Sequence, residues 1–260
     1  MSVPTELNAQ LERTILIEAP PATVFAYFTD SALWARWWGE GSSIDARPGG
    51  TMRILYPGNN EALGEVVAVE PPHRIVFTYG YASGEPIAAG ASQVTISLRA
   101  VDRGTELELR HAFADPAVRA THIQGWRFQL ALFANLVTDT LHAEAAALAD
   151  AWYAVWAETD AARRGAELAR ITTRDIRFRD RFGHTNGHAD LHDHIGAAQH
   201  YMPGVTVNRQ GAPRHCQGTL LCDWIAKNPQ GATVMAGATV FSLTADGRFE
   251  AITTLPPPAA

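Results

Sequence analysis

The feature that most constrains the fold is a long helical segment that follows a run of strand-like segments. Its apolar residues recur at i, i+4, i+7 and i+11, namely Trp126, Leu130, Phe133 and Val137. This spacing predicts one buried face on a helix that starts near Asp115-Pro116 and continues to about residue 139. Five segments with strand-like periodicity precede it, at residues 51–56, 62–70, 74–81, 93–100 and 105–111. Since one helix cannot fill the concave face of a curved antiparallel sheet, the pattern predicts a cavity between helix and sheet.

Several segments of this first half resemble the START-like helix-grip superfamily. They are Arg13–Glu18, Pro21–Phe25, the Trp34…Trp37-Trp38 cluster, Arg47–Gly50 and His122…Gly125-Trp126. The branch they resemble most is that of the activator of the heat-shock-protein-ninety ATPase, in its small bacterial form. The resemblance covers about residues 10–140. It implies a hydrophobic ligand cavity and no particular reaction.

The second half begins without a Gly-, Pro- or Ser-rich linker, because the segment 142–150 is Ala-rich and helical. A helical stripe continues through Trp152, Val155 and Trp156, and further helices are expected at about 161–170 and 188–201. Strands are expected at 175–180, 206–210, 214–226, 232–244 and 249–255, with Asp246-Gly247 as a hairpin turn. The proline-ended tail from Pro256 is expected to be loose.

Three helices followed by an antiparallel meander resemble the nuclear transport factor 2-like cone, in its SnoaL-like polyketide-cyclase branch. The residues that carry this resemblance are Trp156…Asp160, Asp175–Phe178, Gly187 with His194-Ile195, Pro203-Gly204, Trp224 and Asp246–Arg248. It covers about residues 145–255 and implies an apolar pocket inside a conical fold. The sequence therefore predicts an α+β chain with a helix-grip domain at 1–140 and a SnoaL-like cone domain at 141–260.

Composition and charge exclude several classes of function. The formal net charge of −6 argues against a nucleic-acid partner, and no apolar run approaches the ~20 residues of a membrane span. The N-terminus shows no secretory signal. Cys216 and Cys222 are expected about 20 Å apart on one extended strand, too far for a disulfide. A reduced, cytoplasmic protein is therefore expected.

No cofactor or metal is expected. The sequence contains no Walker loop, dinucleotide-binding GxGxxG, nucleophile elbow or CxxC pair. His188 and His192 share a helix face that points away from the apolar stripe, while His194 is turned roughly 200° from His192. A regular helix cannot bring all of them, with the turn residue His184, to one ion.

The candidate acid–base residues all belong to the second half. Asp180 follows the strand face of Ile176 and Phe178, His194 lies beside the apolar stripe of its helix, and Arg209 is expected near the cone mouth. On the 214–226 strand, Cys222 and Trp224 share the apolar face, which is the expected pocket wall. His215 and Asp223 are on the opposite face and are expected to point away from the pocket. The expected pocket walls are Tyr153, Trp156, Cys222 and Trp224.

In the first half, the candidate ligand-binding residues are aromatic or lie on apolar strand faces: Trp34, Trp38, Phe77, Tyr79, His111 and Trp126. Each of these residues could instead be an ordinary part of the hydrophobic core with no ligand contact. His111 ends an apolar row, so it needs a polar partner from a ligand, a water or a tyrosine.

Three functions remain open. The leading interpretation is a small-hydrophobic-molecule binding protein with two pocket domains rather than an enzyme. The first alternative is a cyclase or isomerase that transfers protons in the SnoaL-like pocket, with Asp180, His194 and Arg209 as catalytic candidates. The second is a co-chaperone-like interaction module. A homodimer is also expected, because Val234, Val240, Met235 and Phe241 make both faces of their strand apolar.

Overall fold

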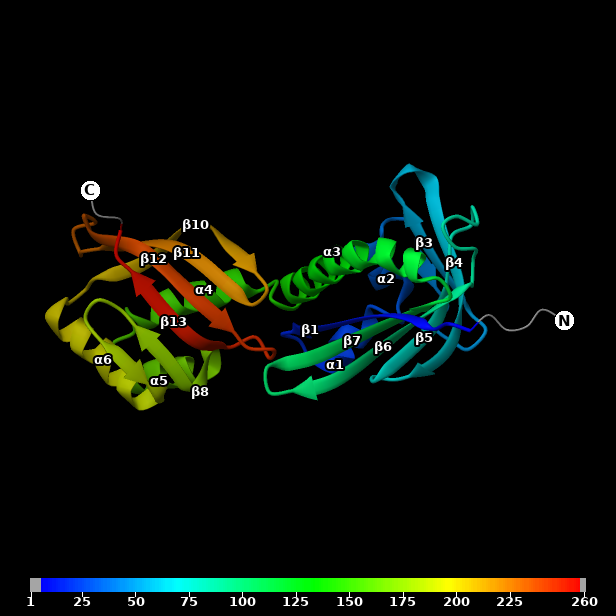
Figure 1. Ribbon diagram of the computed structural model, residues 1–260. Helices are drawn as coiled ribbons and strands as arrows, with labels where there is room; N and C mark the ends of the chain where they lie inside the picture. The colour runs from blue at the N-terminus through cyan, green and yellow to red at the C-terminus, as the bar shows by residue number, and fades with distance from the viewer. Residues whose placement is uncertain (1–5, 258–260) are drawn as a thin grey trace. The chain divides into compact units, whose positions relative to one another are not determined.

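The computed structural model describes residues 6–257, and the chain divides into two compact units, one ending at Val137 and the other beginning at Thr138. Both units combine helices with a large, mainly antiparallel sheet, so the predicted α+β class is confirmed (Figure 1). The strands up to Phe113 form one sheet, and those from Thr172 onward form another. Helix α3 (Pro116–Leu141) carries the chain from the first unit into the second.

The N-terminal unit is a seven-stranded antiparallel sheet with the order β1-β7-β6-β5-β4-β3-β2. Its elements before α3 are β1 (Ala9–Ile17), α1 (Pro21–Ala26), α2 (Ser31–Trp38), β2 (Ser43–Ile44), β3 (Thr51–Tyr56), the short 3-10 helix η1 (Pro57–Asn59), β4 (Asn60–Glu70), β5 (Arg74–Tyr79), β6 (Ser92–Val101) and β7 (Gly104–Phe113). The register brings His111 opposite Leu11 on one side and Val94 on the other. His111 therefore lies on an inner strand, between the edge strand β1 and β6.

Helix α3 starts where the Asp-Pro pair predicts. The Asp115 carboxylate accepts a hydrogen bond of 2.7 Å from the Ala117 amide, which satisfies one of the free N–H groups of the first turn. The expected stripe is buried, since Trp126 and Leu130 are at most 5% exposed and Phe133 and Val137 are fully covered. The ring of Phe133 packs 5.1 Å from that of Phe28, next to α1.

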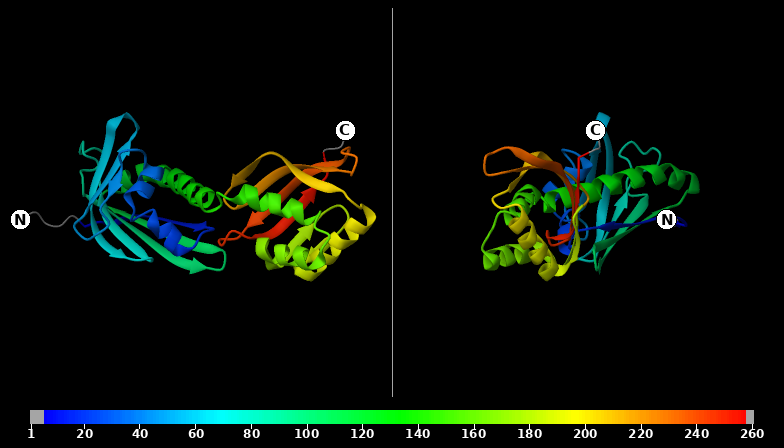
Figure 2. Two further views of the ribbon diagram at one scale, coloured as in Figure 1. Left: turned by 180° about the vertical axis from the view of Figure 1, so that it is seen from behind. Right: turned by 90° about the vertical axis from the view of Figure 1, so that its left-hand side faces the viewer.

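The C-terminal unit is a six-stranded sheet with the order β10-β11-β12-β13-β8-β9. Its elements are α4 (Ala145–Val155), α5 (Ala161–Ile171), β8 (Thr172–Arg179), β9 (His184–Asn186), α6 (Gly187–Tyr201), β10 (Thr206–Cys216), β11 (Thr219–Lys227), β12 (Thr233–Leu243) and β13 (Phe249–Leu255). All neighbouring strands are antiparallel except β13 and β8, which are parallel. The three helices and the sheet enclose one hydrophobic core, and Figure 2 shows the helices from two further sides.

One expected strand is two strands. The sequence predicts a continuous strand over 214–226, but Gln217 and Gly218 both have positive φ, 44° and 78°, and form a tight turn between β10 and β11. The prediction is wrong because a Gln-Gly pair is a weaker turn signal than Asn-Gly or Asp-Gly. Cys216 and Cys222 therefore lie on different strands, and both are free thiols.

A second difference concerns the faces of β12. Strict alternation would place Val234 and Met235 on opposite faces, yet both line the same cavity. The register explains this, because Ala226 pairs with Met235 whereas Lys227 pairs with Thr233. Val234 is thus the extra residue of a β-bulge, where the alternation is interrupted.

No helix in the described part of the chain is long and apolar enough to cross a membrane.

Candidate functional site

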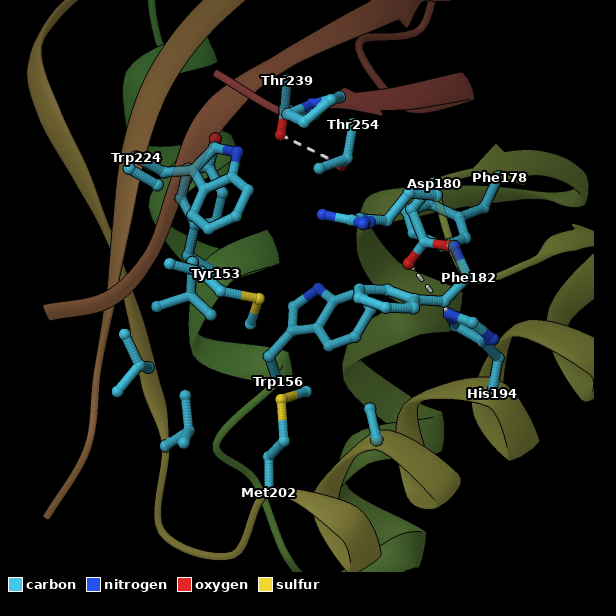
Figure 3. Close-up of a pocket in the computed structure, with 18 of the residues that line it drawn as sticks. Tyr153, Trp156, Phe178, Asp180, Phe182, His194, Met202, Trp224, Thr239 and Thr254 are labelled. Atoms are coloured by element: carbon cyan, nitrogen blue, oxygen red, sulfur yellow. Dashed lines mark hydrogen bonds and ion pairs between the residues drawn. The ribbon is translucent and has the colours of Figure 1, made fainter. Parts of the chain in front are cut away.

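The C-terminal unit contains a cavity of about 690 Å³ (Figure 3). Its wall is formed by residues of α4, α6, β8, β10, β11, β12 and β13 and by the segment after β13. Most of the wall is apolar: aromatic rings, aliphatic side chains and two methionines. This volume and lining are those of a site for a small organic molecule.

Three of the four predicted wall residues line this cavity. They are Tyr153 and Trp156 from the end of α4 and Trp224 from β11. The hydroxyl of Tyr153 and the indole N–H of Trp224 are both buried without a hydrogen-bond partner. The Thr239 hydroxyl lies near Tyr153, but it pairs with Thr254 at 3.2 Å. Burial, the largest influence, raises the pKa of Tyr153, so its phenol stays protonated at neutral pH.

The polar part of the cavity wall contains an Asp–His pair, and Arg181, which follows Asp180 in the chain, also lines the cavity. Asp180 Oδ2 lies 3.1 Å from Nε2 of His194, and the two side chains are only 11% and 18% exposed. Asp180 Oδ1 accepts 2.7 Å hydrogen bonds from the amides of Phe182 and Gly183. The carboxylate is therefore fixed on both oxygens, and its contact with Nε2 selects the tautomer in which Nε2 carries the proton.

Gly183 is required for this arrangement. A Cβ built on Gly183 would lie 2.8 Å from Cε1 and 2.9 Å from Nδ1 of His194, closer than real side chains approach. The turn after β8 therefore needs a residue without a side chain, so that the imidazole can lie against the backbone while remaining next to Asp180.

The other two residues named for this pocket do not line the cavity. Arg209 makes a two-pronged ion pair with Asp150 of α4, with both N···O distances at 2.8 Å. Cys222 is 1% exposed in the adjoining core, and its burial raises the thiol pKa to about 11. Asp223, which the strand pattern places outside, pairs with Arg214 on the surface.

Several cavity residues were missed by sequence reasoning. Phe182, Tyr201, Val234 and Leu255 line the cavity and are 67%, 81%, 47% and 46% exposed, so the cavity opens to solvent. Pro256 and Pro257, at the start of the tail that is expected to be loose, also line it. No periodicity reveals such residues, because they lie in a turn, at a bulge and at the ends of elements.

The histidines of the 184–200 region have separate partners. Nε2 of His188 lies 2.9 Å from Thr172 Oγ1, and Nε2 of His192 lies 3.1 Å from the carbonyl of Ala161. Within residues 6–257, no three His, Cys, Asp or Glu side chains are placed together to hold a metal ion.

In the N-terminal unit, the candidate ligand residues pack against one another. Trp34 is fully buried, donates its indole N–H to the Arg53 carbonyl at 3.0 Å and packs 5.8 Å from Phe77. The Trp38 ring lies 5.7 Å from Trp126, although its own N–H has no partner. These contacts belong to a hydrophobic core, and ligand contact at these positions stays a prediction.

His111 finds its partners inside the protein. The indole N–H of Trp126 donates to Nδ1 at 2.8 Å, so the ring proton lies on Nε2, 2.8 Å from Ser92 Oγ. The Ser92 hydroxyl in turn donates to the carbonyl of Tyr79 at 2.8 Å. Every polar atom of the imidazole is satisfied in the neutral form. Burial, followed by the influence of His122, lowers the pKa of His111 to about 2.

Comparison with known proteins gives a match to one family model. The family model of the Activator of Hsp90 ATPase homolog 1-like protein matches residues 18–138. The resemblance of the first half to that family, expected from its motifs, is thereby confirmed. A comparison with curated proteins gives no match.

Several solved structures are similar to about half of the chain. A candidate isomerase of the SnoaL-like family from Agrobacterium tumefaciens has 24% identity and a TM-score of 0.43, and the match covers 46% of this chain and 99% of that one. The Aha1 dimer from Colwellia psychrerythraea has 16% identity and a TM-score of 0.42, with coverages of 47% and 90%. An HSP90 activator from Plasmodium falciparum has 24% identity and a TM-score of 0.37, with coverages of 46% and 88%.

Proposed function

We propose that the protein binds a small hydrophobic molecule in the cavity of its C-terminal unit. The observation that carries this proposal is a 690 Å³ hollow with a mainly apolar wall that opens past exposed apolar side chains. Apolar surface left in contact with water at such a site gains free energy when an apolar ligand covers it. The resemblance to SnoaL-like proteins supports the same conclusion.

The proposal is tested by filling the cavity from within. Ala198 lies on α6 and lines the hollow, so Ala198→Trp would place an indole where the ligand is expected. The probe is N-phenyl-1-naphthylamine, a neutral apolar fluorophore that is bright only when it leaves water. We expect saturable binding to the wild-type protein and at least a tenfold weaker affinity for Ala198→Trp.

The matched control is Ala169→Trp, an exposed alanine of α5 that does not line the cavity. Equal probe affinity in the wild type and both variants would show that the probe binds elsewhere and would contradict the proposal.

A second candidate function is proton transfer on a neutral substrate, and one observation favours it. Asp180 and His194 form a partly buried carboxylate–imidazole pair on the wall of an open cavity. Such a pair can accept a proton from carbon or oxygen and return it, because the carboxylate stabilises the imidazolium that forms. The surrounding apolar wall would strengthen this electrostatic effect.

This candidate is tested by hydrogen–deuterium exchange at the α-carbon of neutral polyketide-like and terpenoid ketones. Wild-type protein should accelerate the exchange, and Asp180→Asn and His194→Gln should each reduce the rate by about 10²-fold or more. Asp223→Asn, on the surface, is the control. Probe binding without any acceleration in the wild type would leave the cavity as a receptor site.

Two further properties belong to this proposal. We expect a homodimer formed through the outer face of the β10–β13 sheet, which sedimentation equilibrium would detect as a mass of twice 28.2 kDa. We also expect the protein to act in the cytoplasm.

A further inference from the structure

Exposed apolar side chains gather at the cavity. Across the described chain, the large hydrophobic side chains that are strongly exposed are Leu16, Val67, Phe128, Leu132, Phe182, Tyr201, Val234 and Leu255. The last four all line the one cavity. Single exposed apolar residues are ordinary, but a group around one opening indicates a surface that meets something apolar.

A second hollow of about 330 Å³ adjoins the cavity. The two share Met202, Val205, Val234 and Met235 as wall residues, and the second hollow continues between Pro203 and Pro229. We call it the annex. Met202 and Met235 are two of the four methionines of the chain. Because methionine side chains are unbranched and flexible, this shared wall can adapt to an object that passes it.

The polar pair lies at a different end of the cavity. Figure 3 shows Asp180 and His194 on one side of Trp156, with Tyr153 and Trp224 on the other and Met202 below. The annex is lined by apolar groups except for Asn228, whose carboxamide oxygen already accepts the amides of Gln230 and Ala232. A molecule that spans both hollows would therefore have its hydrogen-bonding group at Asp180 and His194 and apolar groups along the rest of its length.

From this arrangement we infer that the ligand is an elongated, uncharged amphiphile. Its polar head, a hydroxyl group that can donate to the pair, meets Asp180 and His194, and its apolar chain crosses Trp156 and passes Met202 and Met235 into the annex. The inference rests on the proposed binding function and adds the chemical class and orientation of the ligand. Asp180 disfavours an anionic head group, and Arg181, which follows it in the chain and lines the same cavity, disfavours a cationic one.

The test is a chain-length series. Primary n-alkanols from hexanol to dodecanol displace N-phenyl-1-naphthylamine, and the dissociation constant is measured for each alcohol. We expect affinity to rise about fourfold per added methylene group as long as each group reaches apolar protein surface. In wild-type protein the rise continues through the longest alcohols, because the annex receives the end of the chain.

Met235→Trp obstructs the passage into the annex. We expect this variant to bind the shortest alcohols as the wild type does, to stop gaining affinity at an intermediate length and to bind dodecanol at least tenfold more weakly. Ala169→Trp is again the control: Ala169 is exposed on α5 and does not line either hollow. Its chain-length profile should match that of the wild type.

Three outcomes decide the inference. A plateau at the same chain length in the wild type and Met235→Trp shows that the annex is not used, and overturns the inference while the proposed binding function stands. If the wild-type protein does not bind the probe at all, both the proposed binding function and this inference are overturned. Met235→Trp could instead change the mass of the protein in solution and leave the chain-length profile unchanged. The exposed apolar side chains would then be contacts with a second copy of the chain, and the inference would be wrong.

Discussion

The aromatic core of the N-terminal unit and the aromatic wall of the C-terminal cavity use the same kinds of side chain in different states. Trp126 donates its indole N–H to His111, and both side chains are packed on every side. Trp224 has an equally buried indole N–H with no acceptor, and its ring faces a hollow. A set of aromatic residues therefore does not by itself indicate a ligand site. The two regions differ in what surrounds the aromatic rings: in the N-terminal unit other side chains fill the space around them, whereas in the C-terminal unit part of that space is an open cavity.

The packing difference gives the largest expected effect. Replacing the fully buried Trp34 with alanine should lower the unfolding free energy of the N-terminal unit by about 3–5 kcal/mol. The missing indole leaves a cavity that the densely packed side chains around it cannot fill. Trp156→Ala should cost less than half as much in the C-terminal unit, since one side of Trp156 is already open. Urea dependence of hydrogen exchange in peptides from each unit measures both values. Equal losses would remove the distinction between the regions.

The pH dependence of His111 sharpens the comparison. Its pKa of about 2 in the folded state lies below the ordinary value of 6.5, so the folded protein keeps a neutral ring while the unfolded chain takes up a proton below pH 6.5. The contribution of His111 to the free energy of unfolding is fully present above pH 6.5. It falls by about 1.4 kcal/mol per pH unit below that value, which amounts to about 2 kcal/mol by pH 5.

His111→Gln should remove that slope from the N-terminal unit, and the exposed His184→Gln should leave it unchanged. The measurement is urea unfolding at pH 7 and pH 5, followed by hydrogen exchange. An identical pH dependence in the wild type and His111→Gln would show that His111 is not held neutral by burial.

The smallest expected effect compares the two indole N–H groups directly. Trp126→Phe should destabilise its unit by about 1–3 kcal/mol, because Nδ1 of His111 loses its donor in a buried place. Trp224→Phe should change stability by no more than about 0.5 kcal/mol, since no hydrogen bond is lost. Thermal unfolding by calorimetry measures the difference. A larger cost for Trp224→Phe would show that its N–H has a partner, such as an ordered water.

Much of the fold follows from periodicity. The strands at 51–56 and 249–255 and the long helix from Pro116 are where the alternating and helical patterns predict them, because each has one buried face. The tight turn at Gln217-Gly218 and the bulge at Val234 are not predictable in this way. Both depend on local backbone geometry, and each moves neighbouring side chains to another strand or face.

The candidate site was only partly predictable for the same reason. Asp180 and His194 were named separately, one from a strand face and the other from a helix face, and their 3.1 Å contact depends on the Gly183 turn. Arg209 was expected at the cone mouth, but the sequence does not show that Asp150, 59 residues away, pairs with it. Contacts between elements are set by tertiary packing, which periodicity within one element does not encode.

The measurement that tests the central claim most directly is photoaffinity labelling of the full chain. A neutral, elongated alkanol with a diazirine in its chain is irradiated in complex with the protein, and labelled residues are identified by peptide mass spectrometry. We predict labels on residues 152–156, 197–207 and 234–257, which supply much of the cavity and annex walls. Labels confined to residues 34–38, 77–79 and 111–126, the aromatic core of the N-terminal unit, would contradict the account.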